Sequence, residues 1–114
     1  MLTIDALKEY GANTDEGLKR CFGNEGFYLK LVKSAPGEAS FDKLFEAIEA
    51  NDLDAGFEAA HALKGVLSNL SLDSLSEPVK EITELLRNKT DADYSPYIAK
   101  IKEKHAELKK ICED

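Results

Sequence analysis

The sequence predicts an all-α protein, an antiparallel up-down four-helix bundle with additional short N-terminal helices. Apolar residues recur at helical spacing along most of the 114 residues, and no segment alternates in the manner of a strand. Short connections join the four longest helical segments, which favours antiparallel neighbours. The length suits a single domain over residues 1–114, with N-terminal helices at about 1–35 and the bundle core at about 38–112.

Three short helices are expected before the bundle, each delimited by capping or helix-breaking residues. They span about residues 3–10, 14–22 and 25–35. A glycine follows each of the first two, and Asn13 or Thr14, and then Asn24, can cap the next helix. Pro36-Gly37 ends the third helix because proline cannot continue the helical hydrogen bonding.

The four bundle helices are expected over about 38–50, over 53–72, around 79–86, and from Ser95 to about Cys112. Asn51-Asp52 separates the first two, a turn over residues 71–76 precedes the third, and a polar loop over 88–93 precedes the last. Pro78 belongs in the first turn of its helix or causes a kink. Ser95-Pro96 is typical of a cap and a first helical residue.

The second bundle helix carries the most distinctive run of the chain, Ala60-His61-Ala62-Leu63-Lys64-Gly65. With residues about 100° apart around a helix, the apolar positions form one buried stripe, made of Leu53, Ala60, Leu63, Leu67 and Leu70. His61, Lys64 and Ser68 share an outward stripe, with Gly65 beside it. We therefore expect an exposed histidine with a lysine one turn along.

These residue types together suit phosphoryl acceptance. A neutral imidazole nitrogen is a good nucleophile, and Lys64 supplies a mobile positive charge for phosphate oxygens. Gly65 weakens the helix by up to about 1 kcal/mol relative to alanine, and its missing side chain lets a partner come close. From spacing alone, an ordinary surface histidine beside an incidental glycine is the open alternative.

The same run, followed by Leu70, Leu72 and Leu75, resembles the histidine-containing phosphotransfer (HPt) domains of bacterial multistep phosphorelays. The similarity covers about residues 41–86. The resemblance implies that His61 carries the phosphoryl group, on its outer nitrogen Nε2. It also implies that Lys64 assists with that group and that Gly65 keeps the approach open.

The sequence departs from the family pattern close to the histidine. The family usually has small residues where Val66 and Leu67 stand, and a glycine where Ser71 stands. These changes leave the nucleophile in place and bear on how a receiver domain docks. Beside Gly65, Ser68 is expected to allow close approach, and Phe57 and Leu72 are candidate docking residues because the wheel places both near the outward stripe.

Two other chemistries fit the sequence less well. Glu58 and His61 have the Glu-x-x-His spacing of di-iron bundles, but a second copy ending at His105 would begin with Lys102. There is no Gly-x-Ser-x-Gly elbow and no P-loop. His105 borders the apolar face of its own helix, so we expect a packed residue without a role in chemistry. No metal site and no cofactor are expected.

Composition narrows the possible partners and the compartment. The formal charge of −7 argues against a nucleic-acid surface and against anionic membranes. Cys21 and Cys112 form no CxxC or zinc-like cluster, and reduced thiols suit a cytoplasmic protein. The N-terminus lacks the basic and hydrophobic regions of a signal peptide, and no apolar run has the length of a membrane span. We expect a cytoplasmic monomer.

The expected function is therefore that of a histidine phosphocarrier, not of an autonomous enzyme. It would relay a phosphoryl group between aspartates of receiver domains in a two-component phosphorelay, with a hybrid histidine kinase or a response regulator as partner. Phosphoryl transfer is mostly positioning and charge neutralisation, which a metal bound to the receiver can supply. The alternative is a helical interaction module that binds receiver or kinase domains without carrying phosphate.

Overall fold

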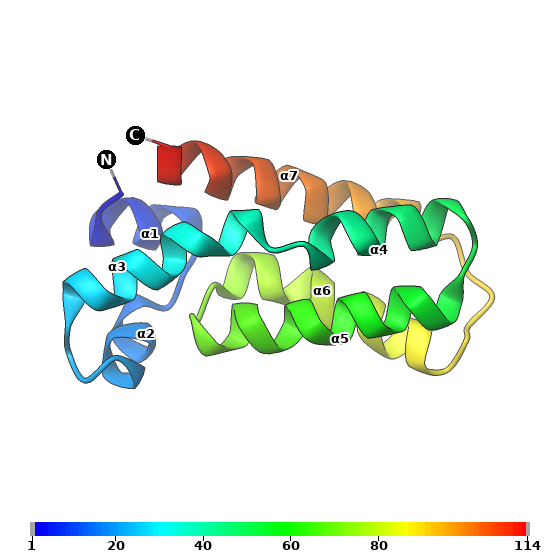
Figure 1. The fold of residues 1–114 in the computed structure, drawn as a ribbon, viewed down its shortest axis with the longest axis horizontal. Helices are drawn as coiled ribbons and strands as arrows, with labels where there is room; N and C mark the ends of the chain where they lie inside the picture. Colours follow the sequence, from blue (N-terminus) through cyan, green and yellow to red (C-terminus); the bar gives the residue numbers. More distant parts are fainter. Residues whose placement is uncertain (1, 114) are drawn as a thin grey trace.

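The computed structural model describes residues 2–113, and within them the chain is helical, with no strand. The helices are α1 (Ile4–Tyr10), α2 (Thr14–Arg20), α3 (Glu25–Ser34), the 3₁₀ turn η1 (Ala35–Gly37), α4 (Ser40–Glu49), α5 (Leu53–Asn69), α6 (Asp73–Arg87) and α7 (Ser95–Glu113). Along the bundle α4 packs on α5, α5 on α6 and α6 on α7 (Figure 1). The predicted all-α helical bundle is confirmed.

Asn13 and Asn24 cap helices as predicted, whereas Ser95, expected as a cap, is the first residue of α7. The carboxamide oxygens of Asn13 and Asn24 accept the backbone N–H groups three residues further along, at 3.2 and 3.0 Å. The Asp52 carboxylate accepts from the N–H of Ala55 at 3.1 Å, and this bond fixes the start of α5. Each bond satisfies a donor that the first helical turn would otherwise leave free.

The connection between α5 and α6 is tighter than predicted. Helix α5 ends at Asn69, and α6 begins at Asp73, so the expected turn over 71–76 is wrong. Ser71 has a φ of 56°, and its carbonyl accepts the backbone N–H of Asn13 at 2.8 Å. A contact from the distant α1–α2 connection thus helps to set this turn. Pro78 consequently lies inside α6, beyond its first turn.

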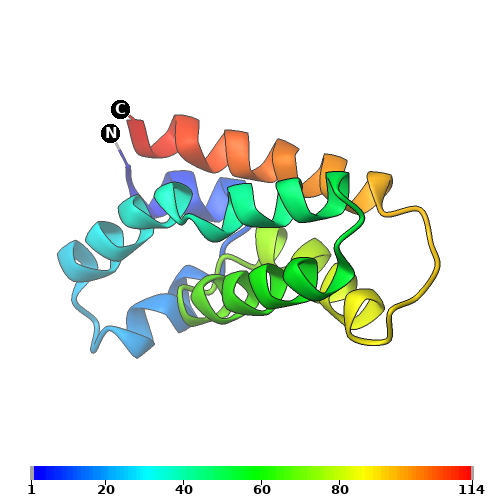
Figure 2. The ribbon, with the colours of Figure 1, turned by 45° about the vertical axis from the view of Figure 1, so that its right-hand side comes forward.

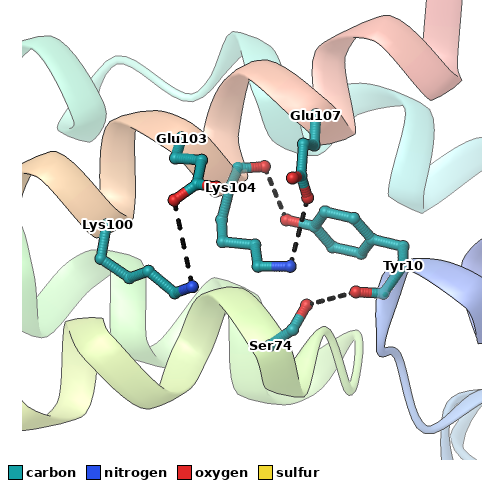
Figure 3. A network of polar contacts seen from close by, with 6 residues as sticks. All are labelled: Tyr10, Ser74, Lys100, Glu103, Lys104 and Glu107. Atoms are coloured by element: carbon teal, nitrogen blue, oxygen red, sulfur yellow. Dashed lines mark hydrogen bonds and ion pairs between the residues drawn. The ribbon is translucent and has the colours of Figure 1, made fainter.

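The N-terminal helices pack at one end of the bundle, where hydrogen bonds attach them. The Tyr28 hydroxyl on α3 donates to the carbonyl of Leu70 at 2.8 Å. The Tyr10 hydroxyl at the end of α1 donates to the carbonyl of Lys104 on α7 at 2.7 Å, and the Ser74 hydroxyl on α6 donates to the carbonyl of Tyr10 at 2.8 Å (Figure 3). Tyr10 thus links three helices. Helices α3 and α4 follow one another along one side of the molecule (Figure 2).

His105 on α7 is a packed residue, as predicted. Its ring stacks on that of Phe41, with centroids 4.0 Å apart and planes inclined by 17°. The His105 Nε2–H group donates to the carbonyl of Pro36 at 2.8 Å, which ties the 3₁₀ turn between α3 and α4 to α7. Of the two histidines in the chain, His105 is the one with these packing and hydrogen-bond contacts.

Candidate functional site

His61 lies at the middle of α5, and its side chain is exposed. Within residues 2–113 neither ring nitrogen makes a hydrogen bond. This is the arrangement expected of a nucleophile that must meet a group on another molecule. A histidine that served the fold would be held by partners, as His105 is.

An aromatic ring and a cation lie on one side of His61. The ring of Phe57, one turn earlier on α5, is half-buried, and its centroid lies 5.7 Å from that of the imidazole. The guanidinium carbon of Arg87 on α6 lies 5.3 Å from the same phenyl ring, a distance typical of a cation–π contact. Arg87 is not predicted from the sequence, because the rotation of α6 about its axis cannot be read from the chain.

Lys64 follows His61 by one turn and is half-buried. Residues three positions apart are neighbours on a helix surface, so Lys64 lies on the same face of α5 as His61. Helix α5 thus places Phe57 one turn before His61 and Lys64 one turn after it.

Gly65 has no structural reason to be glycine. It is exposed, its backbone is helical, and apart from its chain neighbours and the backbone of its own helix, a Cβ atom there would meet no atom of the described chain within 4 Å. Gly17 is different, because a Cβ there would lie 2.5 Å from the Tyr28 ring. Gly65 therefore costs the helix up to about 1 kcal/mol relative to alanine, and no contact with another element accounts for that cost.

Two residues predicted to line this surface lie elsewhere. Leu72 is fully buried, so its assignment as an exposed docking contact is wrong. The helical wheel fails there because α5 ends at Asn69 and the chain turns at Ser71. Ser68 is half-buried, and its Oγ is enclosed without a hydrogen-bond partner, so it does not form an open approach. The exposed stripe of α5 is therefore shorter than predicted.

On the other side of His61 an open groove separates α4 from α5. Small side chains line much of it, namely Ser40, Ala47, Ala50, Ala55, Ala59 and Ala62, and its charged residues are Lys43, Glu46, Asp52 and Glu58. The groove reaches Ala62, the residue that follows His61 in α5.

The described residues hold neither a cluster of metal ligands nor a candidate membrane span. Among residues 2–113 no three His, Cys, Asp or Glu side chains converge as ligands would. Glu58, the residue that suggested a di-iron motif, is exposed. No helix in this part of the chain combines the length and the apolar character needed to cross a bilayer.

The sequence matches the model of a known protein family. A sequence model described as the Hpt domain matches residues 37–111, which include α4 to α6 and most of α7. The chain belongs to the Hpt domain family. Hpt domains are histidine phosphotransfer modules of phosphorelays, and they act as phosphocarriers. A comparison with curated proteins found no match, and neither did a comparison with solved structures.

In this Hpt domain the match covers the whole of α5 and therefore the region around His61. Helices α1 to α3 lie before the matched residues and are attached to the bundle through Tyr10, Tyr28 and Asn13. The site therefore offers an exposed imidazole without a hydrogen bond in the described part of the chain, a phenyl ring 5.7 Å from it, and an arginine over that ring.

Proposed function

We propose that this Hpt domain is a histidine phosphocarrier and that His61 exchanges a phosphoryl group with the aspartates of receiver domains. The observation that carries the proposal is the exposed imidazole on α5, which has no hydrogen bond within the described residues and lies inside the family match. Residues 1–114 act as one domain in this proposal, with α1 to α3 supporting one end of the bundle. The domain works as a monomer, in the cytoplasm, where receiver domains act.

The proposed step is a direct displacement at phosphorus. The lone pair of His61 Nε2 forms the N–P bond, while the P–O bond to the receiver aspartate breaks and the aspartate leaves as a carboxylate. The ring then loses its Nδ1 proton to water, which leaves a neutral imidazole ring bearing the negatively charged phosphoryl group. In the reverse direction a second receiver's aspartate attacks the phosphorus, and His61 regains a proton. A divalent metal bound by the receiver would supply the part of the charge stabilisation that this chain does not.

The neighbours of His61 have separate roles in this step. Lys64 neutralises part of the phosphoryl charge, because an ammonium on a flexible stem can follow the group as it moves. Gly65 allows the receiver backbone to approach. Phe57 offers the half-buried apolar contact on which the receiver docks, since its ring borders His61.

The test is transfer from phosphorylated receiver domains, followed by an acid-lability assay. Wild type and His105→Gln should both acquire an acid-labile phosphate, whereas His61→Gln should acquire none. Because the chain has two histidines, this pair of variants covers all possible phosphohistidines. Equal labelling of His61→Gln, or no labelling of wild type by a panel of receivers, would refute the proposal. Receiver binding without labelling would instead identify a helical interaction module.

A further inference from the structure

We infer that Phe57 is a positioning residue for the phosphoryl transfer, because its ring holds the imidazole of His61 in one rotamer and so fixes the direction of the attacking nitrogen. The inference rests on the proposed function and gives Phe57 a part in the chemical step in addition to docking. It starts from a contact between the two rings, whose centroids lie 5.7 Å apart with planes inclined by 39°. This separation and tilt are typical of an attractive aromatic pair.

The imidazole of His61 needs such a contact if it is to keep one orientation. Exposed side chains exchange between staggered rotamers within picoseconds to nanoseconds. His61 is exposed and has no hydrogen bond within residues 2–113, so the Phe57 ring is the contact that restricts it. A nucleophile reacts faster when its attacking atom is already aligned with the bond that breaks. Restriction of the ring therefore favours transfer.

The Phe57 ring is itself held, and it can therefore restrict its neighbour. The side chain is half-buried and packs against the hydrophobic core. The guanidinium carbon of Arg87 lies 5.3 Å from the ring centroid, a cation–π contact that adds to the packing. Phe57 and His61 are four residues apart on α5, a spacing at which side chains are neighbours on a helix surface. The core thus fixes the phenyl ring, and the phenyl ring limits the imidazole.

Phe45 on α4 provides a matched control. It is also half-buried, and Lys102 Nζ lies 5.1 Å from the centroid of its ring. The same ring lies 6.4 Å from the ring of a histidine, His105, which has a stacking contact and a hydrogen bond of its own. Replacement of Phe45 by leucine therefore removes the same kind of packing and leaves the contact between Phe57 and His61 in place.

The experiment compares Phe57→Leu, Phe57→Tyr and Phe45→Leu with wild type. The first readout is the rate at which His61 is labelled by phosphoramidate, a small donor that needs no docking surface. The N–P bond of the donor breaks as the bond between phosphorus and Nε2 forms, and the ammonia that leaves takes the ring proton. An aromatic pair changes a rotamer population by about 2- to 12-fold, so Phe57→Leu should slow labelling about fivefold. Phe57→Tyr, which keeps the ring, and Phe45→Leu should match wild type.

Two further readouts separate positioning from packing and from docking. In proton NMR a single helical rotamer gives His61 unequal couplings between Hα and the two Hβ protons, and exchange between rotamers averages them. The couplings should be unequal in wild type and Phe57→Tyr and nearly equal in Phe57→Leu. With a phosphorylated receiver as donor, Phe57→Leu should lower the maximal rate by the same factor as with phosphoramidate. The receiver concentration that gives half this rate should stay unchanged, because leucine keeps an apolar docking contact.

The outcomes separate this inference from the proposed function. A labelling rate for Phe57→Leu within about twofold of wild type, an equal loss in Phe45→Leu, or no recovery in Phe57→Tyr would each overturn the role of Phe57, while labelled wild type upholds the carrier. Couplings that are equal in wild type, or that stay unequal in Phe57→Leu, would overturn it as well. Slowing with the receiver but not with phosphoramidate would show a docking contact only and also overturn it. Wild type that neither donor labels refutes the proposed function and the inference with it. Circular dichroism melting curves verify that each variant is folded.

Discussion

Replacement of Gly65 by alanine should change stability and function in opposite directions. A Cβ at this position meets no side chain and no other element within 4 Å, so the substitution introduces no clash with the rest of the described chain. Alanine is favoured over glycine in a helix interior by up to about 1 kcal/mol. The free energy of unfolding should therefore rise by about 0.5–1 kcal/mol, with a melting temperature several degrees higher.

The added methyl group should at the same time slow transfer from a phosphorylated receiver. A methyl inserted into a close-packed contact costs about 1–3 kcal/mol, and each 1.4 kcal/mol corresponds to tenfold. We expect a loss of about 10-fold or more with the receiver as donor, and no loss with phosphoramidate, which needs no close backbone approach. Quenched-flow measurements with both donors, together with urea unfolding curves, give the two quantities.

Gly56 in the same helix provides the control for this substitution. A Cβ there would meet Ile48 and Leu86 at 3.4 and 3.5 Å, which are ordinary contacts, and the position is buried away from solvent. Gly56→Ala should leave transfer from the receiver unchanged. A destabilised Gly65→Ala, or one that accepts phosphate from the receiver as fast as wild type, would refute the reasoning about close approach.

Three further predictions concern the fold. Leu72→Ala should lower the free energy of unfolding by about 3 kcal/mol, because the side chain is fully buried, and a change of less than 1 kcal/mol in urea unfolding would contradict its place in the core. His105→Ala should cost about 2 kcal/mol through the lost stacking and the unpaired Pro36 carbonyl, while phosphoramidate still labels His61 at the wild-type rate. Burial raises the pKa of Tyr28 to about 12, and burial together with the charge of Glu107 raises the pKa of Tyr10 well above its usual range. Both phenols stay protonated in the folded chain, whereas in the unfolded chain they ionise near pH 10. The free energy of unfolding should therefore be insensitive to these groups below pH 10 and fall as the pH rises above it. Tyr10→Phe should make that fall shallower in unfolding curves at pH 8 to 11.

Local signals predicted most of the fold because the chain marks its helix ends with short-range chemistry. Asn13, Asn24 and Asp52 cap the helices that follow them, and each of these bonds spans three residues. The apolar stripe of α5 likewise follows from helical spacing, and Leu63 and Leu67 are fully buried as expected. Such features depend on the sequence nearby and can be read without knowing the neighbouring helices.

The errors arose where distant segments decide the structure. Helical spacing continued to Leu72 puts this residue on the outward stripe. In the structure the chain turns at Ser71, whose carbonyl accepts the backbone N–H of Asn13, and Leu72 lies in the core. The enclosure of Ser68 depends on neighbouring side chains in the folded chain, which no helical wheel records. The position of Arg87 could not be predicted for the same reason, since its place over Phe57 depends on how α6 packs against α5.

The central claim is that His61 carries the phosphoryl group on Nε2, and nitrogen-detected NMR of the protein labelled with ¹⁵N-histidine tests it most directly. With two histidines in the chain, the spectrum holds two imidazole patterns, which His61→Gln and His105→Gln assign. After reaction with a phosphorylated receiver, the account predicts phosphorus coupling to Nε2 of His61 and an unchanged pattern for His105. Coupling at His105, or phosphate incorporation with neither imidazole altered, would contradict it.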